Sequence, residues 1–111
     1  MDEYLIKIQN NAEFITHYSE GRCAGFVAFY CNDKKKHLAF ITLVLLAPEF
    51  RGKSIARDLI LYTLSFCKRR IFQRCDLEVR KGNYSAIKLY ESCGFNAERE
   101  TSDSLIMSVH L

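Results

Sequence analysis

The chain has 111 residues, of which 49% are hydrophobic and 26% are charged. This length suits one domain with a single core, and the composition is that of an ordinary globular protein, not of a disordered or collagenous one. The net charge of +3 would favour an anionic ligand, but nucleic-acid-binding domains are commonly more basic, with a pI above about 9.

Neither export nor membrane insertion is indicated by the sequence. No run approaches the eighteen or so apolar residues of a membrane span, and the N-terminus is acidic where a signal peptide would be basic. The five cysteines include no C-x-x-C pair and no histidine lies at metal-ligand spacing from them, which argues against a disulfide framework and a zinc site. We therefore expect a cytoplasmic protein without nucleic-acid, membrane or metal partners, whose cysteines fill the core.

The first half of the chain is dominated by strand patterns. Residues 2–10 are the exception, because their apolar residues lie near helical spacing and predict a short helix. Two β-branched and aromatic runs, 12–19 and 23–31, flank a glycine-containing turn at 20–22 and predict a hairpin. The nearly continuous apolar run at 37–47 predicts a central strand that is buried on both faces.

The second half alternates between helix and strand patterns. Apolar residues on one stripe predict a helix over 55–70, and the next run, 75–80, predicts a strand. Asn83 suits the N-cap of a second helix, and Gly94 suits the C′ position that ends it. With a closing strand at 104–111, the pattern indicates an α/β fold with a mixed sheet.

The stretch LLAPEFRGKSIARDL, residues 45–59, raises the question of a phosphate site, because GKS at 52–54 is how a P-loop ends. A P-loop reads G-x-x-x-x-G-K-(S/T), and here Ala47 stands at its first glycine. Pro48 removes a backbone donor that the loop would use. The alternative is a strand, a short turn and a helix whose first N–H groups and dipole face an anion. The sequence favours this second device over a nucleotide-binding P-loop.

Two segments together resemble the signatures of the GNAT superfamily of acetyl-coenzyme A-dependent N-acyltransferases. Residues 51–56 resemble its pyrophosphate-binding motif, (Q/R)-x-x-G-x-(G/A), with Arg51 first, Ser54 in the place of the glycine and Ala56 last. Residues 77–95 are similar to a second signature, N-x-x-A-x-x-L-Y-x-x-x-G-F. That signature is matched at every fixed position, by Asn83, Ala86, Leu89, Tyr90, Gly94 and Phe95.

This resemblance covers roughly residues 12–111 and implies a mixed, mainly antiparallel central sheet flanked by helices. Family members have a strand and a helix before the element expected at 2–10, so we expect this chain to lack the family's first strand and first helix. The strand at 12–19 would then be an exposed edge that could pair with a second copy of the chain in a homodimer.

The resemblance implies acetyl-coenzyme A as cosubstrate and an amine of a small molecule or peptide as acceptor. The coenzyme's arm would lie along the strand that ends at Leu45 and Leu46, whose backbone N–H groups would meet the acetyl carbonyl. Its diphosphate would bind the N–H groups of Arg51, Gly52, Lys53, Ser54, Ile55 and Ala56. Asn83 would contact the coenzyme arm. A purely structural role for Asn83, as the N-cap of its helix, also stays open.

For catalysis, the resemblance implies that Tyr90 is the general acid toward the departing thiolate, although a tyrosine packed against the core would look the same. Glu78 is the candidate general base, because its place resembles that of a glutamate in the branch acting on ribosomal-protein N-termini. A solvated surface role for Glu78 also stays open, and Glu49 and His37 are weaker candidates. A coenzyme-binding module without catalysis is the remaining alternative.

Overall fold

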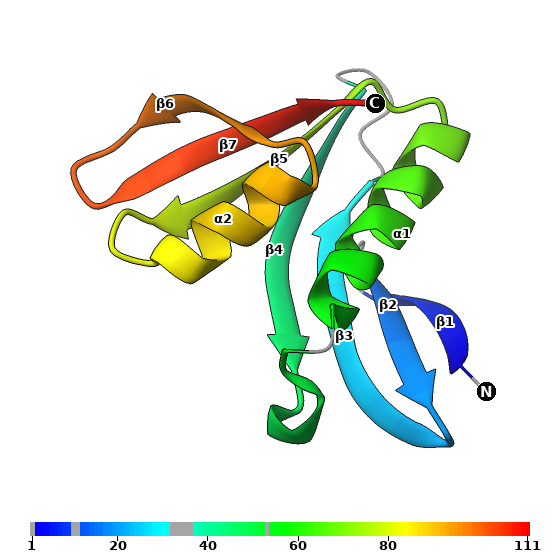
Figure 1. Ribbon diagram of the computed structural model, residues 1–111. Coiled ribbons are helices and arrows are strands. Elements are labelled where there is room, and N and C mark those ends of the chain that lie inside the picture. Colours follow the sequence, from blue (N-terminus) through cyan, green and yellow to red (C-terminus); the bar gives the residue numbers. More distant parts are fainter. Residues whose placement is uncertain (1, 10–11, 32–36, 53) are drawn as a thin grey trace.

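The computed structural model describes residues 2–9, 12–31, 37–52 and 54–111, and these form one sheet and its helices (Figure 1). The strands are β1 (Asp2–Gln9), β2 (Ala12–Ser19), β3 (Arg22–Tyr30), β4 (Leu38–Leu46), β5 (Arg74–Arg80), β6 (Asn96–Glu100) and β7 (Ser104–His110). The helices are α1 (Ile55–Arg69), α2 (Tyr84–Ser92) and the 3-10 turn η1 (Pro48–Phe50). No helix in these described ranges is long and apolar enough to cross a membrane.

The seven strands form one sheet in the order β1-β2-β3-β4-β5-β7-β6. Every neighbouring pair is antiparallel except β4 and β5, which are parallel and are connected through α1. This arrangement confirms the predicted α/β class with a mixed, mainly antiparallel sheet. The hairpin is also confirmed: its turn residues Glu20 and Gly21 both have positive φ, 52° and 77°, as the twist of a tight hairpin favours.

The helix predicted for residues 2–10 is wrong, because the segment is strand β1. It pairs with β2 without interruption from Asp2↔Ser19 to Gln9↔Ala12. A strand neighbour therefore outweighs a local pattern that could be read with either period. The strand at 12–19 is consequently not an edge strand, and the argument for a homodimer through that strand does not hold.

The core lies between one face of the sheet and the two helices. Buried side chains of alternate strand positions, such as Ile15, Val27 and Leu77, pack with Leu59 and Ile60 of α1. Residues from α2 border the same cluster. Both helices therefore stand on one face, and in the parts of the chain that the structure describes no helix covers the other face (Figure 1).

The prediction that β4 is buried on both faces is wrong, because its two buried residues share one face, while Leu38 and Phe40 on the other face are only half-buried. Ala39 and Ile41 are buried, whereas Leu43 and Leu45 keep 46% and 49% of their surface exposed. The second half of β4 has no partner on its β5 side, because the parallel pairing ends at Ile41↔Leu77. Strand β6 was not predicted, since all of its residues are exposed and it carries no apolar alternation.

Four of the five cysteines, Cys31, Cys67, Cys75 and Cys93, are buried, as predicted for core-filling side chains, while Cys23 is exposed. Burial raises the pKa of the Cys75 thiol to about 12. This thiol therefore stays protonated at neutral pH and acts as a small apolar group.

Candidate active site

The site is built around the place where β4 and β5 separate. The two strands pair from Leu38↔Arg74 to Ile41↔Leu77 and then diverge, as Figure 1 shows. An irregularity in β4 lies at the same point: Ala28 pairs with Leu43 and its neighbour Phe29 pairs with Ile41, so Thr42 is an extra residue. Such a bulge bends its strand, and it accounts for the opening between β4 and β5.

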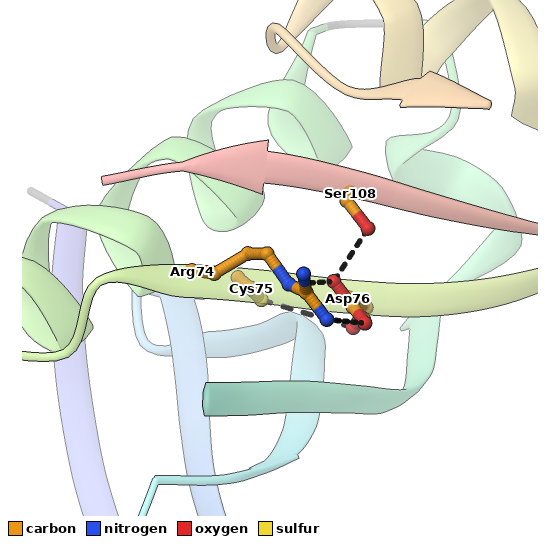
Figure 2. A network of polar contacts seen from close by, with 4 residues as sticks. All are labelled: Arg74, Cys75, Asp76 and Ser108. Atoms are coloured by element: carbon orange, nitrogen blue, oxygen red, sulfur yellow. Dashed lines mark hydrogen bonds and ion pairs between the residues drawn. The ribbon is translucent and has the colours of Figure 1, made fainter. Parts of the chain in front are cut away.

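A buried polar network holds the closed end of this opening (Figure 2). Asp76 is only 4% exposed and accepts hydrogen bonds from Ser108 Oγ at 2.6 Å and from Arg74 Nη2 at 3.2 Å. Arg74 Nε also lies 3.1 Å from the Asp76 carboxylate. The network joins β5 to β7 one residue before the last β4–β5 pair.

On the helix side, the opening continues into a cleft of about 560 Å³ that brings together the two sequence signatures. Predicted residues from β4, from the following loop and from α2 line it together, namely Leu45, Leu46, Arg51, Gly52, Ala56, Asn83 and Tyr90. Ile55 packs against the core beside it instead. The predicted Lys53 lies outside the described residues.

The N-terminus of α1 borders this cleft. Ser54 is its N-cap, and the serine side chain makes no capping hydrogen bond. The first N–H groups of a helix have no partner within the helix, and here Ser54 does not supply one. The amides of Phe50 and Arg51, in contrast, already donate to Ala47 O and Pro48 O within η1, at 2.9 and 3.3 Å. A P-loop would need such loop amides to bind phosphate. The geometry therefore favours the N-terminus of α1, and not a P-loop, as the phosphate-binding site.

Ser54 adopts the left-handed conformation, with φ 61° and ψ 12°, at the position where the family motif has glycine. A side chain in this conformation costs roughly 1 kcal/mol relative to glycine. We therefore expect Ser54→Gly to raise the free energy of unfolding by about 0.5–1 kcal/mol, and coenzyme affinity to be kept or increased. Urea unfolding and calorimetric titration of acetyl-coenzyme A measure the two effects.

Ser65→Gly is the matched control, because Ser65 is exposed in the interior of the same helix. There the change should destabilise by about 0.5 kcal/mol. A Ser54→Gly protein that is less stable than the wild type would contradict the assigned strain.

Helix α2 places Asn83 and Tyr90 on the other wall of the cleft. Asn83 is the N-cap, as predicted, and its side chain accepts a hydrogen bond from Ala86 N at 3.3 Å. Gly94 follows the C-cap residue with φ 99°, which confirms its predicted C′ position. Asn83 thus has a structural role and also lines the cleft.

Tyr90 is half-buried, and its ring meets the Phe95 ring edge-on at 6.0 Å. Burial raises the pKa of the Tyr90 phenol above its ordinary value near 10, and the neighbouring Cys93 acts in the same direction. The phenol is therefore protonated at neutral pH. A protonated hydroxyl at the wall of a cleft can donate to an anionic leaving group.

A smaller cavity of about 200 Å³ lies in the opening itself and joins the two predicted catalytic residues. Glu78 and Tyr90 both line it, together with Ile41 to Val44 of β4. Glu78 also lines a cavity of about 420 Å³ with Phe40 and Asp103. Phe40 and Glu78 alternate with the core residues Ile41 and Leu77, so this larger cavity lies on the face without helices.

The structure does not bring Glu49 or His37 to this site. Glu49 forms an exposed ion pair with Arg22 at 3.1 Å, and His37 lines a separate cavity with Arg74 and His110. Both were the weaker base candidates in the sequence.

Sequence reasoning did not single out Arg80, Asp103 or Gly25. Arg80 lines both the opening and the cavity on the face without helices. Asp103 lies in the turn before β7, where its carbonyl accepts from Lys81 N at 3.0 Å, and turn residues carry no periodic signal. Gly25 pairs with Leu46, and a Cβ at this position would lie 2.5 Å from Leu45 O. The glycine thus lets β3 approach the cleft end of β4, which only the paired structure reveals.

The site has a parallel strand pair that opens beside a helix N-terminus and a tyrosine on the facing helix, in agreement with the resemblance to acetyltransferases in the sequence. The model of the acetyltransferase (GNAT) family matches residues 1–95, and the chain belongs to this family.

An uncharacterised N-acetyltransferase of Methanocaldococcus jannaschii is 31% identical over 97 residues, which are 84% of this chain and 42% of that protein. A putative ribosomal protein bS18-alanine N-acetyltransferase of Bacillus subtilis is 30% identical over 83 residues, 75% of this chain and 53% of the relative. The chain thus spans about half the length of these relatives.

Among solved structures, the PaiA N-acetyltransferase of Thermoplasma acidophilum in complex with coenzyme A has the same fold. Its TM-score is 0.82 at 22% identity, over 91% of this chain and 62% of that one.

Proposed function

We propose that the protein is a cytoplasmic N-acetyltransferase that moves an acetyl group from acetyl-coenzyme A directly to a primary amine within a ternary complex. The observation that carries the proposal is the opening between β4 and β5, where Glu78 and Tyr90 line one cavity. This cavity adjoins the cleft at the N-terminus of α1 through their common residues Val44, Asn83 and Tyr90.

The coenzyme would occupy the helix-side cleft. Its diphosphate would accept hydrogen bonds from the first N–H groups of α1, and Arg51 would add a positive charge beside them. The pantetheine arm would follow the unpaired second half of β4 toward the cavity. Family membership and the coenzyme A bound by the Thermoplasma protein of the same fold support this assignment.

In the proposed reaction, Glu78 accepts a proton from the acceptor ammonium through water, which leaves a neutral amine. The amine nitrogen attacks the thioester carbon, and backbone N–H groups near Leu45 and Leu46 stabilise the oxyanion. The C–S bond then breaks, and Tyr90 donates its phenolic proton to the thiolate. The nitrogen loses its extra proton as the amide forms, and this proton passes through water to the Tyr90 phenolate and restores the phenol. The products are an acetylated amine and free coenzyme A.

The acceptor would enter from the opposite face, through the cavity of about 420 Å³. Two carboxylates line it, from Glu78 and Asp103, together with the guanidinium of Arg80. The carboxylates would attract an ammonium group. The Bacillus relative is named for acetylation of a ribosomal-protein alanine, so a peptide with an N-terminal alanine belongs in the acceptor panel beside small amines.

The test is release of free thiol from acetyl-coenzyme A with a panel of amines, for the wild type and for Glu78→Gln. We expect Glu78→Gln to lower kcat by roughly 100-fold at neutral pH. The loss should shrink as the pH rises, because the amine then deprotonates without a base. Glu91→Gln, an exposed change on α2, is the control and should have no effect.

Coenzyme binding without thiol release from any amine would instead indicate the non-catalytic module. Magnesium-dependent binding of ATP, with no binding of acetyl-coenzyme A, would restore the P-loop alternative and overturn the proposal.

A further inference from the structure

The two edges of the sheet differ in how they are protected. Strand β6 is a short edge of five residues, all exposed, in which Glu98, Arg99 and Glu100 are charged and whose pairing with β7 is irregular. Charge, shortness and irregularity are the features that keep an edge strand from pairing with another chain. This edge is therefore protected.

Strand β1 is the opposite kind of edge. It has eight residues, contains no proline, and pairs with β2 without a register shift. Leu5, Ile6 and Ile8 are 54%, 42% and 61% exposed. Because side chains alternate along a strand, these residues lie on both faces of the sheet. Within the described residues, no strand pairs with its outer side.

We propose that β1 pairs with β1 of a second copy of this chain, antiparallel and about a two-fold axis, so that the two sheets continue into one. A two-fold axis perpendicular to the sheet keeps each face on its own side, so the exposed apolar residues of both strands stay together. The unpaired N–H and C=O groups of each edge then become the partners of the other.

The sequence of β1 is complementary to itself in this arrangement. With the axis at Leu5, Tyr4 stands opposite Ile6 of the second copy, which joins an aromatic to a β-branched residue.

The strand is also held in place for pairing. The Tyr4 ring stacks on Tyr62 of α1 at 4.3 Å and on His17 of β2 at 4.6 Å. The edge is therefore fixed to the helix face of the sheet and does not have to be ordered on association, which lowers the entropic cost of binding.

The interface has a definite size. An eight-residue strand is about 27 Å long, so pairing along it alone buries an area at the low end for specific complexes. We therefore expect the dimer to have a dissociation constant in the micromolar range. The β4–β5 opening lies at the other side of β2 and β3, so each copy keeps its own site and its activity per chain.

The test is sedimentation velocity from about 1 to 500 µM, a range that brackets the weak affinity expected of so small an interface. The samples are the wild type, the double variant Leu5→Lys with Ile8→Lys, and the control Ile71→Lys. All three replaced side chains are more than half exposed, with Ile71 at 71%, so folding should be kept. The wild type and the control should become dimers as concentration rises, while the double variant stays a monomer.

Hydrogen exchange identifies the edge directly. Amides of residues 2–9 should be better protected at high than at low concentration in the wild type, and equally protected in the double variant. A wild type that is monomeric at 500 µM would overturn the proposal. So would a dimer that survives Leu5→Lys with Ile8→Lys. Loss of acetyl transfer would leave the dimer proposal untouched, since assembly is measured without substrate.

Discussion

Replacing Tyr90 with Phe is expected to lower kcat by roughly 100-fold or more, because a positioned general acid contributes on that order. The affinity for acetyl-coenzyme A should change little, since phenylalanine keeps the ring that packs edge-on against Phe95. Initial rates of thiol release over a range of acetyl-coenzyme A concentrations separate the two quantities. Tyr84→Phe, on the same helix and 73% exposed, is the control and should behave as the wild type. An unchanged kcat in Tyr90→Phe would remove the acid assignment.

The raised pKa of Tyr90 also has a consequence for stability. Because burial favours the protonated phenol in the folded state, this group stabilises the fold fully below its unfolded pKa near 10. That contribution is lost as the pH rises through the higher folded pKa. Urea unfolding between neutral pH and pH 11 should therefore show a steeper alkaline loss for the wild type than for Tyr90→Phe.

Replacing Arg74 with Met is expected to lower the free energy of unfolding by about 2 kcal/mol, because it leaves the Asp76 carboxylate buried without its cation. Removing one partner of a fully buried pair costs about 3–5 kcal/mol. The Arg74 side chain is 40% exposed, however, so solvent screening reduces the expected loss.

The double variant Arg74→Met with Asp76→Leu is the informative control. It removes the unpaired charge as well as the pair, and replacing a buried ion pair with apolar residues is often close to neutral. We expect it to recover at least half of the loss in urea unfolding. A double variant that is less stable than Arg74→Met would show that the Asp76–Ser108 hydrogen bond matters more than the ion pair.

Much of the fold could be predicted because local and tertiary preferences agree. The period of α1, the N-cap and C′ glycine of α2, and the positive-φ turn of the β2–β3 hairpin all have short-range causes. The helix prediction for β1 was wrong because the spacing of its apolar residues fits both the helical and the strand period. Its pairing with β2 determines that the segment is a strand. Strand β6 was not predicted because all of its residues are exposed, so its sequence shows no alternation of apolar and polar residues.

The site divides in the same way. Most residues that line the cleft belong to the two sequence signatures. Glu78 and Tyr90 line one cavity, and their catalytic roles stay predictions. Asp103, Gly25 and the Asp76 network depend on which strands become neighbours, through contacts between residues far apart in the chain. A local sequence pattern does not predict such contacts, so the roles of these residues could be recognised only from the structure of the sheet.

The opening between β4 and β5 connects a cavity on one face of the sheet to a cleft on the other. Donor and acceptor would therefore arrive through different entrances, and neither would block the other. We expect either one to bind first, so that double-reciprocal rate plots intersect and are not parallel. Free coenzyme A could depart while the acetylated product is still bound, and each product should inhibit competitively against the substrate that shares its entrance.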